Sequence, residues 1–127
     1  MLFRSYVGCE VAPDRLREAI EGARAMHWIG LNLTVPHKLL AVPLMDVLDD
    51  SAREWGAVNT VVFEAQDEEG LWRPVGQVRD PKGPWRTRGC NTDADAIIRS
   101  VREDLAMDPC GARVLLLGAG EIGRAHV

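Results

Sequence analysis

The feature that most constrains the fold of this chain is an alternation of apolar segments with helical patterns over its first half. Residues 3–7, 28–35 and 57–63 are apolar runs of strand length. Between them, residues 13–27 carry the 3.6-residue apolar period of an amphipathic helix, and residues 39–55 predict shorter helical pieces. The order strand, helix, strand, helix, strand predicts an α/β fold.

Prolines and a glycine set where these elements end. Pro36 cannot donate to a strand ladder, so the second strand is expected to stop there and a helix to follow. Pro43 is expected to divide the next helical segment in two, and Gly56 is a suitable stop for a short helix beginning at Ser51. Lys38 therefore lies at a junction between a strand and a helix.

The second half of the chain changes character. Residues 64–88 are polar and rich in glycine and proline, which predicts an elaborated hairpin or a surface loop. Thr92 and Asp93 are suitable N-caps for an amphipathic helix that ends before Pro109. Residues 113–117 then predict a buried strand that runs directly into a glycine-rich turn.

This turn has the pattern Gly-x-Gly-x-x-Gly, which is typical of dinucleotide-binding folds. Its residues are Gly118, Ala119, Gly120, Glu121, Ile122 and Gly123. The glycines permit a tight turn and close approach of a pyrophosphate, which backbone N–H groups and the positive end of the next helix would bind. The residue that distinguishes NAD from NADP is expected about 20 residues further on, so the pattern does not choose between them.

Composition excludes several other classes of function. The net charge is −4, and no cluster of lysine and arginine predicts binding to nucleic acid. No apolar stretch reaches the roughly 18 residues that span a membrane, and the N-terminus lacks the layout of a signal peptide, so we expect a cytoplasmic protein whose partners are small molecules. Cys9, Cys90 and Cys110 match no metal-binding spacing, so no metal is expected.

Three further motifs, together with the glycine turn, resemble those of the shikimate dehydrogenase family. Residues 32–38 read Asn-Leu-Thr-Val-Pro-His-Lys, close to the family's Asn-Val-Thr-Ile-Pro-His-Lys. Residues 56–60 read Gly-Ala-Val-Asn-Thr and residues 91–93 read Asn-Thr-Asp, as in the family. All four motifs occur in the family's order, and the resemblance covers the chain apart from an insertion at residues 64–88.

The resemblance implies an incomplete substrate-binding α/β domain at residues 1–108, without its first strand and helix. Residues 109–127 would form the first strand and glycine turn of a Rossmann NAD(P)-binding domain. Such a chain is expected to be weakly stable and inactive by itself. The implied activity is NADP-dependent interconversion of 3-dehydroshikimate and shikimate in aromatic amino-acid biosynthesis. A quinate/shikimate dehydrogenase using NAD and a non-catalytic metabolite-binding regulator remain alternatives.

The resemblance also assigns roles to individual residues. Lys38 is implied as the acid/base group at the developing alkoxide, and Asp93 as its carboxylate partner. Without the resemblance they would be interpreted as a solvated lysine and a helix N-cap. Thr34 and Asn59 are implied as ligands of substrate hydroxyl groups, because such side chains both donate and accept hydrogen bonds. Asn32 is equally suited to binding substrate and to bracing its own loop.

Three neighbouring residues are expected to have structural roles. His37 adjoins Lys38, but adjacent residues at a helix start point in different directions, so a structural hydrogen bond is expected of it. Thr60 and Asn91 are expected to support the backbone.

Overall fold

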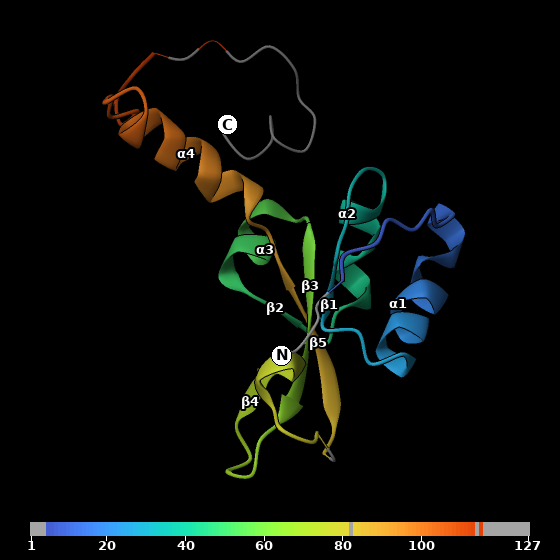
Figure 1. Cartoon of the computed structure of the whole chain (residues 1–127). Helices are drawn as coiled ribbons and strands as arrows, with labels where there is room; N and C mark the ends of the chain where they lie inside the picture. Colours follow the sequence, from blue (N-terminus) through green and yellow to red (C-terminus); the bar gives the residue numbers. More distant parts are fainter. Residues whose placement is uncertain (1–4, 82, 114, 116–127) are drawn as a thin grey trace.

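The computed structural model describes residues 5–81, 83–113 and 115, which form a mixed sheet flanked by helices (Figure 1). The strands are β1 (Gly30–Asn32), β2 (Val47–Leu48), β3 (Thr60–Gln66), β4 (Trp72–Pro74) and β5 (Trp85–Cys90). The α-helices are α1 (Leu16–Ala25), α2 (His37–Leu40), α3 (Asp50–Trp55) and α4 (Asp93–Glu103). Short 3-10 turns are η1 (Pro13–Arg15), η2 (Val42–Leu44) and η3 (Val75–Gln77). The predicted α/β class is confirmed.

Strand β3 organises the sheet. The strand order is β1-β3-β5-β2, and β4 also pairs with β3. β3 runs antiparallel to β1, β4 and β5, whereas β2 runs parallel to β5. At one end of the sheet, Asn32, Thr60 and Cys90 stand side by side in register on β1, β3 and β5. The three motifs found in the sequence therefore meet at this end.

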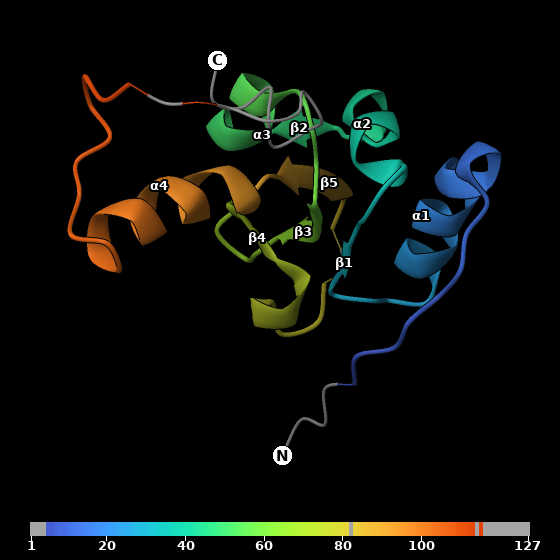
Figure 2. The same cartoon turned by 90° about the horizontal axis from the view of Figure 1, so that it is seen from above.

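Helix α1 forms because its apolar residues recur at helical spacing. Leu16, Ile20 and Ala23 are buried against the core, and burial of a side chain such as Leu16 or Ile20 stabilises the fold by about 2 kcal/mol. The predicted helix at residues 13–27 is confirmed in type, with η1 as its first turn. Seen from above, α1 and α4 lie on opposite sides of the sheet (Figure 2).

The core lies where β3 and β5 meet the loop before β3. Val58, Val61 and Phe63 are fully buried. Gly89 on β5 has no space for a side chain, because an added Cβ would come within 2.7 Å of the Val58 side chain and 2.8 Å of that of Met45. This close approach fixes β5 against the segment that carries Asn59.

Two predicted strands are shorter than expected or absent. Residues 5–7 have no regular structure, and Tyr6 is 83% exposed. Of residues 28–35, only Gly30–Asn32 form a strand, and that strand is partly exposed rather than buried. Apolar composition alone does not make a strand, because each backbone needs a pairing partner, and in the described residues β1 pairs only with β3.

One further segment differs from the predictions in type, whereas the ends of α3 and α4 agree with them. Pro43 does divide the helical segment, but Val47–Leu48 form a parallel strand because they find β5 as a partner. Gly56 ends α3 in the left-handed conformation, with φ of 60°, as predicted. Helix α4 ends at Glu103, well before Pro109.

The C-terminal predictions are mostly untested by the structure. Arg113 and Leu115 are described and have no regular structure, whereas the rest of the predicted strand and residues 118–123 of the glycine turn lie outside the described residues. None of the helices in the described ranges is long and apolar enough to cross a membrane.

Candidate active site

Lys38 and Asp93 form an ion pair at the end of the sheet. The Lys38 Nζ donates to the Asp93 Oδ2 across 2.7 Å, although 55 residues separate the two in sequence. Lys38 is in the first turn of α2, which starts directly after Pro36, and Asp93 is the first residue of α4. The Lys38 side chain is 14% exposed and that of Asp93 is 39% exposed, so the pair is shielded on the lysine side and open to solvent on the other.

The environment keeps the carboxylate of this pair ionised. The hydrogen bond from Lys38 is the largest cause that holds the pKa of Asp93 below its ordinary value of 3.8. A hydrogen bond from Asn59 acts in the same direction, and burial opposes both. Asp93 is therefore negatively charged at neutral pH, as a partner of an ammonium group must be.

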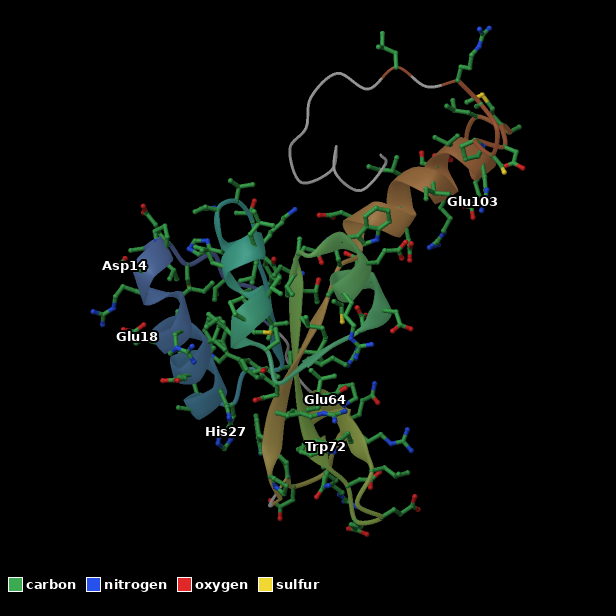
Figure 3. All side chains as sticks on the ribbon, turned by 180° about the vertical axis from the view of Figure 1, so that it is seen from behind. Asp14, Glu18, His27, Glu64, Trp72 and Glu103 are labelled. Atoms are coloured by element: carbon green, nitrogen blue, oxygen red, sulfur yellow. The ribbon has the colours of Figure 1, made fainter. Side chains whose placement is uncertain are left out.

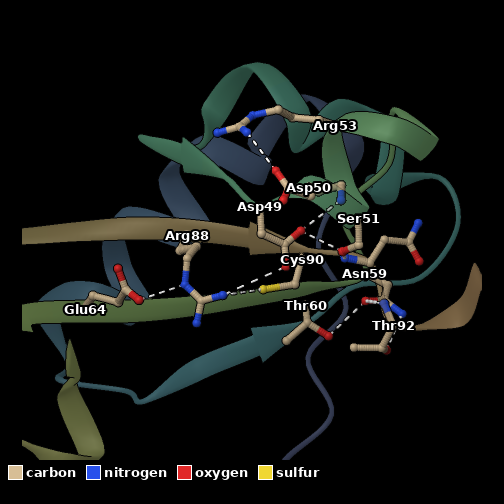
Figure 4. A network of polar contacts seen from close by, with 12 residues as sticks. Asp49, Asp50, Ser51, Arg53, Asn59, Thr60, Glu64, Arg88, Cys90 and Thr92 are labelled. Atoms are coloured by element: carbon tan, nitrogen blue, oxygen red, sulfur yellow. Dashed lines mark hydrogen bonds and ion pairs between the residues drawn. The ribbon is translucent and has the colours of Figure 1, made fainter. Parts of the chain in front are cut away.

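Side-chain oxygens accept hydrogen bonds from the backbone segment that carries Asp93. The N–H of Asn91 donates to the Ser51 Oγ at 2.9 Å. The N–H of Thr92 donates to the Asn59 Oδ1 at 3.1 Å, and the N–H of Asp93 donates to the Asn91 Oδ1 at 3.0 Å. Three consecutive N–H groups at the start of α4 thus each have a side-chain acceptor. Figure 4 shows two of the acceptor residues, Ser51 and Asn59, near Thr92.

Asn59 is the centre of a polar chain that links β1 to α4. Its Nδ2 donates to the Thr92 Oγ1 at 2.9 Å, and its Oδ1 accepts from the Thr60 hydroxyl at 2.9 Å. The Thr60 Oγ1 in turn accepts from the Asn32 Nδ2 at 3.2 Å. Asn59 is 8% exposed, so its amide is buried but satisfied. Thr60 and Asn91 both contact this region, in line with their expected supporting roles.

Asn32 is connected toward the ion pair only through Thr60 and Asn59, and Thr34 lies on the loop before α2. The Asn32 Oδ1 accepts from the Tyr6 hydroxyl at 3.2 Å, so both ends of its amide brace the loop. The Thr34 carbonyl accepts from the N–H of His37 at 2.8 Å, while the Thr34 side chain is exposed. The structural hydrogen bond expected of the His37 imidazole is not found at Nε2, which is buried and has no hydrogen-bond partner.

A cavity of about 1030 Å³ lies beside these loops, between the N-terminal segment, α1 and β1. Asn32, Thr34 and His37 line it, whereas Lys38, Asn59 and Asp93 do not. The rest of its lining is mainly apolar, including Leu16 and Trp28. The ion pair and this cavity are therefore neighbouring features rather than one site.

A second charged cluster lies on the sheet and was not predicted from the sequence. The buried Glu64 accepts from Arg86 and from Arg88, each at 2.7 Å. The Arg86 guanidinium also stacks over the Trp72 ring at 4.3 Å, and Figure 3 shows Glu64 and Trp72 close together on the sheet. Arg86 and Arg88 are two apart on β5, so a strand places both on the face that carries Glu64.

The cysteines and carboxylates do not form a metal site in the part of the chain that the structure describes. Cys9, Cys90 and Cys110 are free thiols. Burial and a hydrogen bond to Asp49 raise the pKa of Cys90 to about 11, so its thiol stays protonated. The predicted cofactor-binding residues, 118–123, cannot be placed relative to the ion pair, because they lie outside the described residues.

Comparison with known proteins gives a consistent result. Residues 2–61 match the family model described as the shikimate dehydrogenase substrate binding domain. The NADP-dependent shikimate dehydrogenase of Geobacter metallireducens is 39% identical over 122 residues, which are 96% of this chain and 36% of that protein. The chain thus spans about a third of the length of such curated relatives.

Two solved structures are also similar. The shikimate 5-dehydrogenase of Thermus thermophilus, in complex with shikimate, is 28% identical with a TM-score of 0.64, covering 91% of this chain and 36% of that one. The quinate dehydrogenase of Corynebacterium glutamicum, in complex with NAD, is 32% identical with a TM-score of 0.61, covering 87% of this chain and 32% of that one.

Proposed function

The chain belongs to the shikimate dehydrogenase family, and we propose that it supplies the proton-transfer and substrate-binding groups of an NADP-dependent shikimate dehydrogenase. The reaction would be the reversible reduction of 3-dehydroshikimate to shikimate. The proposal extends to the domain division, with residues 1–108 on the substrate side and residues 109–127 beginning the cofactor side. The observation that carries it is the 2.7 Å ion pair between Lys38 and Asp93.

Reduction of a ketone needs a proton at the oxygen while a hydride reaches the carbon. The Lys38 ammonium would donate a proton to the developing alkoxide, which yields the alcohol and a neutral amine. Asp93 holds the ammonium in place and lowers the cost of its charge on the lysine side of the pair, which is shielded from water. Its partly exposed carboxylate connects the lysine to solvent, from which the proton would be replaced. In the oxidation direction, the neutral amine would accept the proton.

Hydroxyl groups of the substrate require donors and acceptors close to this pair. Asn59 lies close enough to the ion pair, because its amide contacts Thr92 and lowers the pKa of Asp93. Thr34 presents an exposed side chain on the loop that leads into α2. We propose both as ligands of substrate hydroxyl groups. Asn32, which is exposed and whose amide bonds to Tyr6 and Thr60, is proposed both to brace its own loop and to bind a substrate hydroxyl group.

The cofactor would supply the hydride as NADPH in the reduction and would accept it as NADP⁺ in the oxidation. The side chains fit that division of labour, because an acid/base pair handles the proton and leaves the electron pair to a cofactor. In the sequence, the residues suited to its pyrophosphate are 118–123.

Quinate oxidation with NAD is the second candidate, because the similar Corynebacterium glutamicum protein is a quinate dehydrogenase in complex with NAD. Quinate and shikimate share ring hydroxyls and a carboxylate, so the same lysine and asparagine would serve either substrate. A non-catalytic regulator would have no use for the lysine and aspartate, and both are present and paired.

A hybrid enzyme tests the proposal. In it, residues 1–127 replace the matching segment of the Geobacter metallireducens enzyme. Shikimate and quinate are each assayed with NADP⁺ and with NAD⁺. Turnover of shikimate with NADP⁺ that is lost in Lys38→Met supports the proposal. A hybrid that folds and binds NADPH but oxidises neither substrate contradicts it, and preference for quinate with NAD⁺ selects the second candidate.

A further inference from the structure

Ser51 connects the cap of helix α3 to the backbone that carries Asp93. Its Oγ accepts from the N–H of Asn91 at 2.9 Å and donates to the Asp49 Oδ1 at 2.6 Å. A hydroxyl that both accepts and donates in this way is fixed in one rotation. Figure 4 shows Ser51 between Asp49 and the start of α4. Nothing in the sequence distinguished this serine from an ordinary helix-start residue.

Asp49 is itself held firmly, so Ser51 has a rigid support. The Asp49 Oδ1 also accepts from the Ala52 N–H at 2.9 Å, which makes Asp49 the N-cap of α3. Although burial raises it, hydrogen bonds from Ser51 and the Ala52 N–H keep the pKa of Asp49 below its ordinary value. Asp49 is therefore ionised at neutral pH and accepts strongly from the Ser51 hydroxyl.

On the other side of Ser51, the backbone has little freedom to move independently. Asn91 is 4% exposed, and its Oδ1 accepts from the N–H of Asp93 at 3.0 Å. Displacement of Asn91 would thus displace Asp93, whose Oδ2 is 2.7 Å from the Lys38 Nζ. The order of contact is Asp49, Ser51, Asn91, Asp93, Lys38.

We propose that Ser51 is a positioning residue of the active site, which sets the place of the Asp93 carboxylate through Asn91. Ser51 bonds to the Asp49 carboxylate and to the Asn91 N–H, so it acts on the pair indirectly, through Asn91. The functional meaning of this inference rests on the proposed role of Lys38 and Asp93. The structural part of the inference, that Ser51 controls the geometry of the pair, does not depend on that catalytic role.

The test is made by NMR on the hybrid enzyme, because residues 1–127 by themselves are expected to be weakly stable. The carboxyl pKa of Asp93 and the hydrogen-exchange rate of the Asn91 N–H are measured in the unchanged hybrid and in Ser51→Ala. The substitution should raise the pKa of Asp93 toward its ordinary value, because Lys38 would meet the carboxylate less often. Exchange at Asn91 should become about tenfold faster, the effect of losing one hydrogen bond.

Three further variants make the result decisive. Ser51→Thr keeps the hydroxyl and should restore both quantities, whereas Ser51→Cys offers only a weak acceptor and should shift them in the same direction as alanine. Ser100→Ala removes another serine that donates to an aspartate, Asp104 at the C-cap of α4, and should change neither quantity. If Ser51→Ala does not fold, Ser51→Cys replaces it.

The inference is overturned if alanine and cysteine at position 51 leave the pKa of Asp93 unchanged, or if threonine shifts it as alanine does. No substrate is needed for these measurements, so they stand even if the hybrid enzyme proves inactive. In an active hybrid, Ser51→Ala should lower kcat with little change in KM for shikimate, and it should move the acidic limb of the pH profile upward.

Discussion

The carboxamide of Asn59 makes two hydrogen bonds to Thr92. Its Oδ1 accepts from the Thr92 N–H at 3.1 Å, and its Nδ2 donates to the Thr92 Oγ1 at 2.9 Å. Asn59 directly precedes β3 and Thr92 directly precedes α4, so this contact fastens the start of the helix to the sheet. The geometry of the Lys38 and Asp93 pair consequently depends on the contacts that join α4 to this end of the sheet.

Replacement of Asn59 by alanine should destabilise the protein. The N–H and the hydroxyl of Thr92 would lose their partners in a contact that is partly buried, and an unsatisfied donor there costs up to about 1–3 kcal/mol. We expect the free energy of unfolding in urea to fall by about 2 kcal/mol. Asn32→Ala is the matched control, because the Asn32 amide is exposed and should cost less than about 1 kcal/mol. Equal losses in the two variants would contradict this account of Asn59.

Glu64→Gln should be strongly destabilising. The Glu64 side chain is 6% exposed and is the acceptor for both Arg86 and Arg88. Removal of one member of a buried charged cluster leaves the others uncompensated, which costs about 3 kcal/mol. Thermal and urea unfolding would measure the loss. Glu18→Gln, which breaks the exposed pair with Arg15, should cost no more than about 0.5 kcal/mol; a similar small value for Glu64→Gln would argue against the cluster's importance.

Stability should decline on the acid side of neutrality. Burial raises the pKa of Glu64, but hydrogen bonds from Arg88 and Arg86 outweigh it and the net shift is downward. The pKa of Asp93 is lowered too, chiefly by Lys38. A lowered folded-state pKa stabilises the protein above the unfolded-state pKa, and this contribution is lost as the pH falls through the folded-state value.

The melting temperature should therefore be level near neutral pH and fall below the ordinary values of 3.8 for Asp93 and 4.5 for Glu64. Calorimetry between pH 7 and pH 3 gives this profile. Glu64→Gln should flatten part of the acid limb. A melting temperature that rises on acidification would show that these carboxylates are not stabilised in the folded protein.

The three cysteines should differ sharply in reactivity. Cys9 and Cys110 are exposed, whereas Cys90 is buried and its pKa is raised from 9.0 to about 11. Since the thiolate is the reactive form, alkylation of Cys90 at pH 8 should be about 100-fold slower than that of the exposed thiols. Mass spectrometry of iodoacetamide-treated protein would follow all three. Labelling of Cys90 in native protein at the rate of Cys9 would contradict its placement in the sheet.

The features that could be predicted from the sequence are those that depend on a local pattern of residues. The α1 helix follows from apolar residues at positions 16, 20 and 23, and the end of α3 follows from Gly56. The meeting of Lys38 and Asp93 could be inferred only through resemblance to a family, because it joins segments 55 residues apart. The periodicity of apolar residues gives no information on contacts between segments so far apart in sequence.

The missed features depend on partners that no local pattern reveals. Val47–Leu48 is a strand because β5 lies beside it, and the buried Glu64 is tolerated because two arginines lie opposite. Ser51 gave no signal, since its hydroxyl gains its role only when Asn91 is brought next to it. Arg86 and Arg88, spaced two apart in a predicted hairpin, were the one available hint of a charged face.

The central claim is that Lys38 is the proton donor and Asp93 its partner. The most direct test is Lys38→Met in the hybrid enzyme, with kcat and KM measured for shikimate and NADP⁺. General acid catalysis contributes about 10²–10⁴-fold, so kcat should fall by that factor with little change in KM. Lys82→Met, at the other lysine of the sequence, is the control and should be neutral. A Lys38→Met enzyme that retains the kcat of its parent would contradict the account.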